Sequence, residues 1–336
     1  MNPLPAEGFE LLSDSLVWDM TLPWKSSYEG VLLPQWKTAQ VNFVSLTMAI
    51  RGDGKQQVTQ QIKRISAHIN ERSDLLLATS VADIRTAMRF NKLAVGLHFQ
   101  ETWPFEGDTE LVEFFYRLGV RHALLAYNLR NLAADGCAER TDSGLSWFGV
   151  DLIKEMNRVG MLVDGTHSGY RSTMEAMELN KGPFIFSHSN PYGVYRHYRN
   201  IKDDQIEACA ATGGVIGVNG LRHFLGPSEG SLAERMADCI DYISTLVGPE
   251  HVGLGLDHVP GAPEERTRAL AAQPRIHPTP ELGDIPRCYA SADVLPELVS
   301  TLLIRKYTEK EIRGFLGLNF LRVAELVWKP VAATAR

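Results

Sequence analysis

Two short segments, MLVDGTH at residues 161–167 and FIFSHS at residues 184–189, decide the fold of this chain. Each begins with an apolar run as long as a buried strand and ends in polar residues that include His167 or His188. Imidazoles at the carboxyl ends of neighbouring parallel strands commonly form a metal site in a (β/α)₈ barrel. Two hydrogen-bonded loop histidines are the alternative. The repeated context favours metal ligands.

Short apolar runs alternate with amphipathic stretches along the whole chain, which is typical of a parallel α/β protein. We predict strands at 16–22, 41–48, 93–100, 122–127, 161–164, 184–187, 215–219 and 252–257. Eight strands are the number that a closed (β/α)₈ TIM barrel requires. A further apolar run at 75–79 is predicted to be a peripheral strand or the end of a helix.

The intervening segments have helical spacing and end at glycines. Apolar residues recur at i, i+3, i+4 and i+7 in 111–118, and 152–159 follows a similar pattern. The Pro-, Gly- and Arg-rich stretch at 260–286 lacks periodicity and is predicted to be a long loop over the barrel mouth. Because no composition break divides the chain, we expect residues 1–336 to form a single domain.

Bulk properties exclude several classes of partner. The net charge is −6 and the basic residues are scattered, so we expect no nucleic acid and no membrane partner. The four cysteines lie far apart without a CxxC pattern, which suits a reducing compartment. No secretory signal and no apolar run of about 20 residues is visible. These features predict a cytoplasmic protein.

Two carboxylates follow or occupy predicted strands. Asp257 ends the segment GLGLD and could be a metal ligand, a general base or a helix N-cap. Asp19 lies within the alternating strand LVWDMTLPW, on the same face as Thr21. A carboxylate inside a barrel is costly unless it is paired or bound to metal, so we expect Asp19 to be functional.

Three further side chains are candidates for the same site. His98 and Gln100 are two residues apart in AVGLHFQ and share the face that should point into the barrel. His98 is therefore a candidate ligand, with a core histidine as the alternative. Arg199 could grip a substrate carboxylate in a bidentate way, although its spacing alone favours a surface ion pair.

Several stretches together resemble the membrane dipeptidase (renal dipeptidase, peptidase M19) family, of which this chain would be a divergent, bacterial-type member. The matching stretches are GVRHALLAYNLRN at 119–131, GLSWFGVDLIKEMNRVGMLVDGTH at 144–167, GPFIFSHSN at 182–190 with Arg199–Asn200, ATGGVIGVNG at 211–220 and HVGLGLD at 251–257. LPW at 22–24 and GLNFLRV at 317–323 extend the similarity over nearly the whole chain.

The resemblance implies an amidohydrolase-like barrel with zinc that hydrolyses dipeptides, including those with a C-terminal D-residue. By position, His167 and His188 match the two histidines of the second zinc site. Asp257 matches the acid that handles protons, and Arg199 matches the arginine that holds the terminal carboxylate. Family members often form dimers, so the resemblance also implies a homodimer.

Three positions depart from the family pattern. The family's His-x-Asp reads Asp19–Met20–Thr21 here, and its bridging glutamate falls on Gln100. Its substrate-contacting histidine falls on Tyr127, followed by Asn128, which we include among the substrate-binding candidates. Without a bridging carboxylate, two adjacent dications would repel each other with little compensation. We therefore predict one Zn²⁺, with metal candidates His167, His188, Asp19, Gln100 and His98.

These features predict a zinc-dependent hydrolase of dipeptides or a related small amide. Asp257 would handle the proton of a metal-activated water, and Tyr127 would donate a hydrogen bond to the oxyanion. The alternative is a catalytically altered or inactive barrel that acts as a binding or scaffold protein, because three ligand-type residues have changed.

Overall fold

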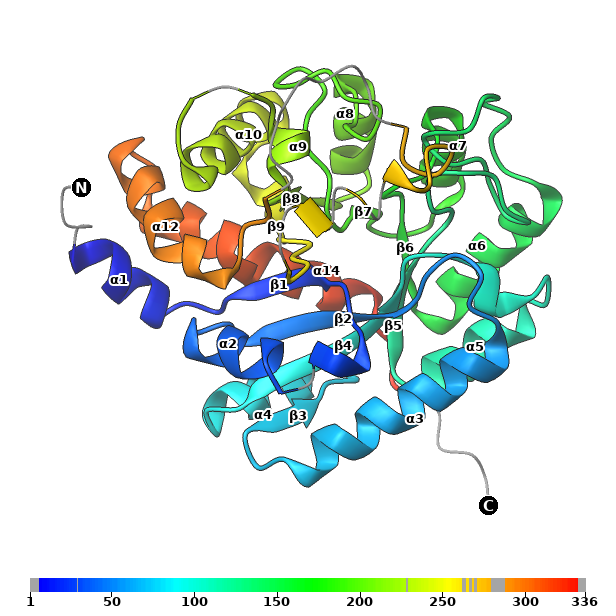
Figure 1. The fold of residues 1–336 in the computed structure, drawn as a ribbon, viewed down its shortest axis with the longest axis horizontal. Coiled ribbons are helices and arrows are strands. Elements are labelled where there is room, and N and C mark those ends of the chain that lie inside the picture. Colours follow the sequence, from blue (N-terminus) through cyan, green and yellow to red (C-terminus); the bar gives the residue numbers. More distant parts are fainter. Residues whose placement is uncertain are drawn as a thin grey trace.

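The computed structural model describes residues 6–28, 30–227, 229–261, 264–265, 268, 271–278 and 288–331. Parallel strands lie at its centre and helices surround them (Figure 1). The strands are β1 (Trp18–Leu22), β2 (Phe43–Ala49), β3 (Leu75–Leu77), β4 (Leu93–Phe99), β5 (Val120–Leu124), β6 (Leu162–Asp164), β7 (Ile185–Phe186), β8 (Val215–Asn219) and β9 (Val252–Gly255).

The strand order is β1-β2-β4-β5-β6-β7-β8-β9, and every pairing is parallel. This path contains the eight strands that the sequence predicts. β3, within the additional run at 75–79, pairs with the first residues of β4. β5 pairs with the last residues of the same strand. The predicted (β/α)₈ barrel is confirmed, with β3 as a peripheral strand.

Barrel closure between β1 and β9 depends on a side chain. Beyond β9, the Asp257 N–H donates to the Thr21 carbonyl over 3.1 Å. The Leu256 N–H donates to Oδ1 of Asp19 over 2.9 Å. The Asp19 carboxylate therefore takes the place of a backbone acceptor at this seam, next to an irregularity in the β1–β2 register.

The helices cover the barrel with apolar faces. Their bounds are α1 (Ala6–Ser13), α2 (Leu32–Thr38), α3 (Lys55–Glu71), α4 (Val81–Arg89), α5 (Glu110–Arg117), α6 (Trp147–Val159), α7 (Tyr170–Leu179), α8 (Asp203–Ala211), α9 (Arg222–Leu225), α10 (Leu232–Val247), α12 (Leu295–Ile304), α13 (Glu309–Arg313) and α14 (Asn319–Val327). Short turns of other helix types lie at Ser26–Tyr28, Trp103–Phe105, Pro249–His251, Ala292–Val294 and Gly314–Leu318.

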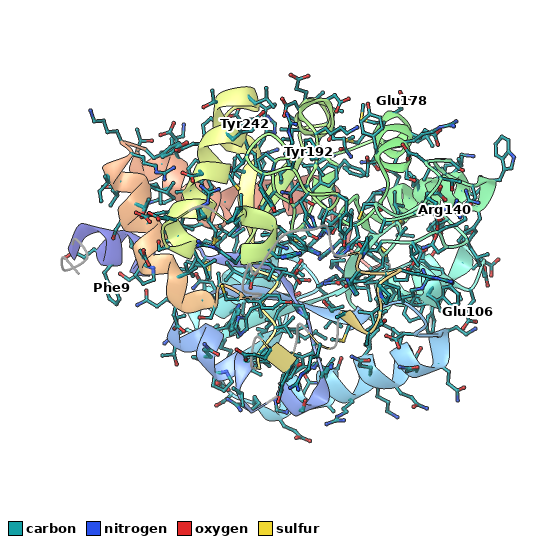
Figure 2. The ribbon with its side chains drawn as sticks, turned by 45° about the horizontal axis from the view of Figure 1, so that its top comes forward. Phe9, Glu106, Arg140, Glu178, Tyr192 and Tyr242 are labelled. Carbon is teal, nitrogen blue, oxygen red and sulfur yellow. The ribbon has the colours of Figure 1, made fainter. Side chains whose placement is uncertain are left out.

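The helix α6 illustrates how the sequence sets these elements. Ser146 caps its first turn by accepting the Gly149 N–H, and Gly160 ends it with a φ of 90°. Leu152, Ile153 and Met156 are buried, as their helical spacing predicts. Trp147, at the start of the helix, is exposed, and the charged residues Glu106, Arg140 and Glu178 of other segments lie at the periphery in Figure 2.

The predicted loop at 260–286 lies partly outside the described residues. Within its described part, Gln273, Ile276, His277 and Pro278 line the large cavity at the barrel mouth. None of the described helices combines the length and the apolar character needed to cross a bilayer.

Candidate active site

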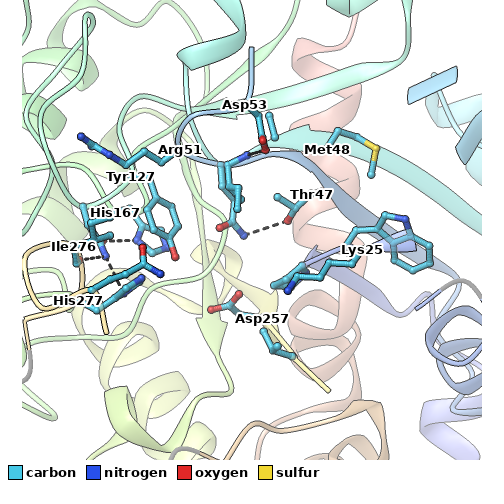
Figure 3. Close-up of a pocket in the computed structure, with 18 of the residues that line it drawn as sticks. Lys25, Thr47, Met48, Arg51, Asp53, Tyr127, His167, Asp257, Ile276 and His277 are labelled. Atoms are coloured by element: carbon cyan, nitrogen blue, oxygen red, sulfur yellow. Dashed lines mark hydrogen bonds between the residues drawn. The ribbon is translucent and has the colours of Figure 1, made fainter. Parts of the chain in front are cut away.

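A cavity of about 950 Å³ opens at the carboxyl ends of the barrel strands. Segments that follow each of the eight barrel strands contribute to its lining. These contributors include Trp24, Arg51, Gln100, Tyr127, His167, Arg199, His223 and Asp257. The carboxyl-terminal face is where barrels of this type carry their active sites. Figure 3 shows Asp257, Thr47 and the Tyr127–His167 pair around this space.

His188 is inserted into the barrel by close backbone packing. A Cβ atom at Gly217 or Gly255 would lie 2.1 Å or 2.0 Å from the Ser187 carbonyl oxygen, so only glycine fits at either position. The imidazole Nδ1 lies 3.0 Å from the Thr21 hydroxyl and 2.8 Å from the Ser187 hydroxyl. Its Nε2 is buried and has no hydrogen-bond partner among the described residues. The ring is thus held from one side and leaves one nitrogen unused.

His167 lies beside His188, with 5.2 Å between the ring centroids. Its Nδ1 lies 2.5 Å from Oδ1 of Asn128. Burial lowers the pKa of both histidines well below the usual range, with the Arg199 charge as the next cause. Both imidazoles are therefore neutral at physiological pH, which is the form that binds a metal ion.

One buried carboxylate organises both histidine-bearing loops. Oδ1 of Asp164 accepts the backbone N–H groups of Thr166, over 3.0 Å, and Ser187, over 3.2 Å. These residues directly precede His167 and His188. Burial alone would raise the Asp164 pKa, but hydrogen bonding and attraction to His122 outweigh it and lower the pKa. A charged Asp164 thus fixes the backbone ahead of both imidazoles.

Three site residues have left-handed backbone conformations. The φ angles are 60° at Asn128, 67° at His167 and 54° at Asp257. Non-glycine residues rarely adopt this region, and such strain concentrates at functional sites. At each of these residues the left-handed conformation turns the backbone sharply after the strand. The turn directs the side chain toward the site.

Asp257 and Arg199 supply opposite charges to the cavity wall. Oδ2 of Asp257 accepts from the Asn219 amide over 3.1 Å. Arg199 is 3% exposed and donates to the His188 carbonyl, over 2.9 Å, and the Ser189 hydroxyl, over 3.2 Å. Its Nε is buried without a partner among the described residues, and Arg199 is one of the residues that line the cavity.

Tyr127 and Gln100 line the same cavity. The Tyr127 ring stacks on His167 with 4.2 Å between centroids. Gln100 donates through Nε2 to the Thr47 hydroxyl over 3.2 Å. Glu101 lies behind them, where its carboxylate accepts the backbone N–H of Tyr127 over 3.2 Å. It therefore supports the loop rather than lining the cavity.

At His98 the structure shows the arrangement of the core-histidine alternative. Its Nδ1 contacts the Ser45 hydroxyl at 2.9 Å and its Nε2 contacts the Thr47 hydroxyl at 3.0 Å. The ring also stacks on His122 at 4.3 Å. Because hydroxyls occupy both nitrogens, His98 belongs to a buried polar layer and has no nitrogen left for a metal ion.

Asp19 also differs from its predicted role. Besides the Leu256 N–H, its carboxylate accepts from Nε1 of Trp36 over 2.8 Å. Burial raises the pKa of the Asp19 carboxyl to about 7. Its oxygens are thus used to close the barrel seam, and Asp19 is not among the residues that line the cavity.

We predict that Asp19→Ala destabilises the fold without removing a bound metal ion. The variant leaves the Trp36 and Leu256 donors buried and unpaired, which should lower the free energy of unfolding by about 2–4 kcal/mol. Urea denaturation and metal analysis of the same preparation measure both effects. Loss of metal from a variant that remains folded would instead make Asp19 a ligand.

Sequence reasoning overlooked several supporting residues. Thr21 and Ser187 hold His188 but carry no spacing signal that distinguishes them from ordinary strand-end polar residues, and Asp164 was not assigned a role. The Asp-Gly-Thr-His run did contain a usable signal. An aspartate at the last strand position, three residues before a candidate ligand, is well placed to accept the backbone N–H groups of the following turn.

The candidate metal donors near the histidine pair are few. The unused Nε2 of His188 and the adjacent neutral His167 form a pair of nitrogen donors. Within the described part of the chain, no group of three or more His, Cys, Asp or Glu side chains is arranged to hold an ion. The oxygen of Gln100 is a further donor in the cavity wall.

The fold and site together define an amidohydrolase-type barrel with a paired-histidine centre. Residues 18–269 match the family described as membrane dipeptidase (peptidase family M19). An amidohydrolase from Pseudomonas aeruginosa is 30% identical, with a TM-score of 0.85, and the match covers 96% of this chain and 99% of that one. A probable dipeptidase from the same organism is 17% identical, with a TM-score of 0.80 over 96% and 97% of the two chains, and shows the shared fold.

Curated relatives agree with this result. An uncharacterized dipeptidase from Schizosaccharomyces pombe is 32% identical over 78% of this chain, and the dipeptidase verJ from Clonostachys rogersoniana is 30% identical over 80%. The matches span 59% and 64% of the lengths of these relatives. The chain belongs to the membrane dipeptidase family, as its sequence motifs predict.

Proposed function

We propose that this protein is a metal-dependent hydrolase that cleaves dipeptides, including those with a C-terminal D-residue, or a closely related small amide. The observation that carries the proposal is the His167–His188 pair, with its buried, unused nitrogen, next to a cavity that His167, Arg199 and Asp257 line. The dipeptidase relatives support the same reaction class.

His167 and His188 would hold one Zn²⁺, with the amide oxygen of Gln100 as the third protein donor. Imidazole nitrogens suit zinc, and a catalytic site keeps an open position. The cation would supply positive charge that lowers the pKa of the attacking water and stabilises negative charge on the substrate carbonyl.

The chain's own residues divide the remaining work. The unpartnered Nε–H of Arg199 would bind the terminal carboxylate of the substrate, because a charged donor fixed by two other hydrogen bonds is already oriented. The Asp257 carboxylate would accept the proton of the attacking water and return it to the leaving amine. The Tyr127 hydroxyl would donate to the developing oxyanion.

The test is hydrolysis of a dipeptide panel with L- and D-residues at the C-terminal position. Protein that contains zinc should release amino acids, and a chelator should abolish the release until zinc is restored. An N-blocked amide without a terminal carboxylate should be a much poorer substrate. Zinc-loaded protein that cleaves no dipeptide and no related amide would overturn the proposal.

We expect Arg199→Lys to raise KM more than it lowers kcat, with a loss in kcat/KM of about 10²-fold. Lysine keeps the charge but loses the planar set of donors, which costs roughly 2–3 kcal/mol at a buried carboxylate site. Steady-state kinetics on the best dipeptide measures this change. An unchanged KM would remove Arg199 from substrate binding.

The second candidate is an inactive barrel that binds small peptides without cleaving them. The lack of a third His, Cys, Asp or Glu at the histidine pair, within the described residues, favours it. Calorimetric binding of a dipeptide by protein that contains no metal and shows no turnover would support this candidate.

A further inference from the structure

One wall of the cavity comes from the segment of residues 271–278. Gln273, Ile276, His277 and Pro278 of this segment line the cavity. The His277 ring meets Tyr127 edge to face, with 5.9 Å between centroids. Tyr127 in turn stacks on His167. The segment thus lies against the aromatic side of the paired-histidine site.

Asn128 connects this wall to His167 through the two ends of one amide. Its Nδ2 donates to the Ile276 carbonyl over 2.8 Å and lies 3.5 Å from Nδ1 of His277. Its Oδ1 lies 2.5 Å from Nδ1 of His167 and also accepts from the Cys137 thiol at 3.3 Å. Figure 3 shows the partners of this amide, His167, Ile276 and His277, beside one another on the cavity wall.

The orientation of this amide determines the tautomer of His167. A backbone carbonyl can only accept, so the Ile276 carbonyl requires the NH₂ group of Asn128 on its side. The amide oxygen must then face His167, where it requires the proton on Nδ1. That tautomer leaves the lone pair on Nε2. A flipped amide would place its oxygen against the Ile276 carbonyl oxygen and its NH₂ group against the Nδ1–H of His167.

The backbone of Asn128 holds the amide between its two partners. The Asn128 carbonyl accepts the Ala138 N–H over 2.7 Å, and its φ is 60°. Asparagine and aspartate tolerate this conformation better than most side chains. The side chain is 1% exposed, so water does not compete for the amide.

We propose that Asn128 is a positioning residue that couples the 271–278 wall to the metal-binding form of His167. This inference rests on the proposed metal role of His167. When the wall segment lies in place, its Ile276 carbonyl selects the amide orientation that presents Nε2 of His167. When the segment moves away, that selection is lost, and His167 is free to exchange tautomers.

Two variants distinguish the contact of Asn128 with His167 from its contact with Ile276. Asn128→Asp keeps an oxygen acceptor for His167 but faces the Ile276 carbonyl with a second oxygen. Asn128→Gly removes both bonds without penalty at a positive φ. Asn180→Asp is the matched control. Nδ2 of Asn180 also donates to a backbone carbonyl, that of Gly182, with a bond length of 2.7 Å. Asn180 is not among the residues that line the cavity.

The decisive readouts use metal-free protein and require no turnover. Deuterium exchange should rise at least about tenfold in 271–278 for both Asn128 variants and stay unchanged in Asn180→Asp. Imidazole ¹⁵N spectra, with the His167 signal assigned by its loss in His167→Gln, should show the Nδ1–H tautomer in wild type and Asn128→Asp. Asn128→Gly should show a mixture of tautomers.

Zinc affinity, measured by chelator competition, should fall about 10–100-fold in Asn128→Gly and less in Asn128→Asp. Unchanged exchange in 271–278 for both variants, or an unchanged His167 tautomer in Asn128→Gly, would overturn the coupling. Failure of the wild-type protein to bind zinc or cleave dipeptides would instead contradict the proposed function. The exchange and tautomer measurements use metal-free protein, so they would still test whether Asn128 couples the segment 271–278 to His167.

Discussion

His188→Ala is expected to lose bound zinc and to reduce kcat/KM on dipeptides by about 10³-fold or more. The side chain contributes a buried Nε2 that has no hydrogen-bond partner among the described residues and is therefore available to the metal ion. A catalytic metal ion contributes several kcal/mol to transition-state stabilisation, and about 4 kcal/mol corresponds to this factor. Metal analysis and steady-state kinetics on one preparation measure the two effects.

A matched control for this variant is His68→Ala. His68 lies on α3 and is not among the residues that line the cavity, so its replacement should leave zinc content and kinetics near the wild-type values. His188→Ala that keeps full activity would contradict the metal role of His188. Wild-type protein that contains no zinc and cleaves no dipeptide would favour the binding-protein candidate.

The second large effect is expected for Asp164→Ala, which should lower the free energy of unfolding by about 3–5 kcal/mol. Removing a buried, hydrogen-bonded carboxylate has a cost of this order, because its partner groups stay buried and unpaired. Here those groups are His122 at 3.2 Å and the backbone N–H groups of Thr166 and Ser187. Urea denaturation followed by circular dichroism measures the change.

Asp164→Asn separates the loss of charge from the loss of hydrogen bonds. Its carbonyl oxygen can still accept both backbone N–H groups, so we expect a smaller loss of about 1–2 kcal/mol. If Asp164→Ala is as stable as wild type, the carboxylate does not organise the two histidine-bearing loops, and the account of how His167 and His188 are positioned fails.

The fold was predictable because its signals are local and repeated. Short apolar runs such as 215–219 are bounded by glycines, and helices such as α6 begin at a serine cap and end at a glycine. Strand length and helix periodicity follow from burial of one or both faces, which a sequence displays directly. Barrel closure followed from the number of strands, but its dependence on the Asp19 carboxylate did not.

Part of the candidate site was predictable for a similar reason. The strand-end positions of His167, His188 and Asp257 place them at one edge of any parallel barrel. The structure places the two imidazoles side by side, and His167, Arg199 and Asp257 line one cavity.

The remaining assignments depend on partners that are distant in sequence. Alternation places His98 and Asp19 on an inner face but cannot show that Ser45 and Thr47 occupy both His98 nitrogens. It also cannot show that Trp36 binds Asp19. A polar residue inside a barrel needs a partner, and a sequence does not reveal whether that partner is a metal ion or another side chain.

The most direct test of the central claim is a crystal structure of zinc-loaded protein with anomalous data collected at the zinc edge. We expect one strong peak about 2.0–2.1 Å from Nε2 of both His188 and His167. A peak beside Asp19 or His98, or the absence of any peak near the histidine pair in protein that cleaves dipeptides, would contradict it.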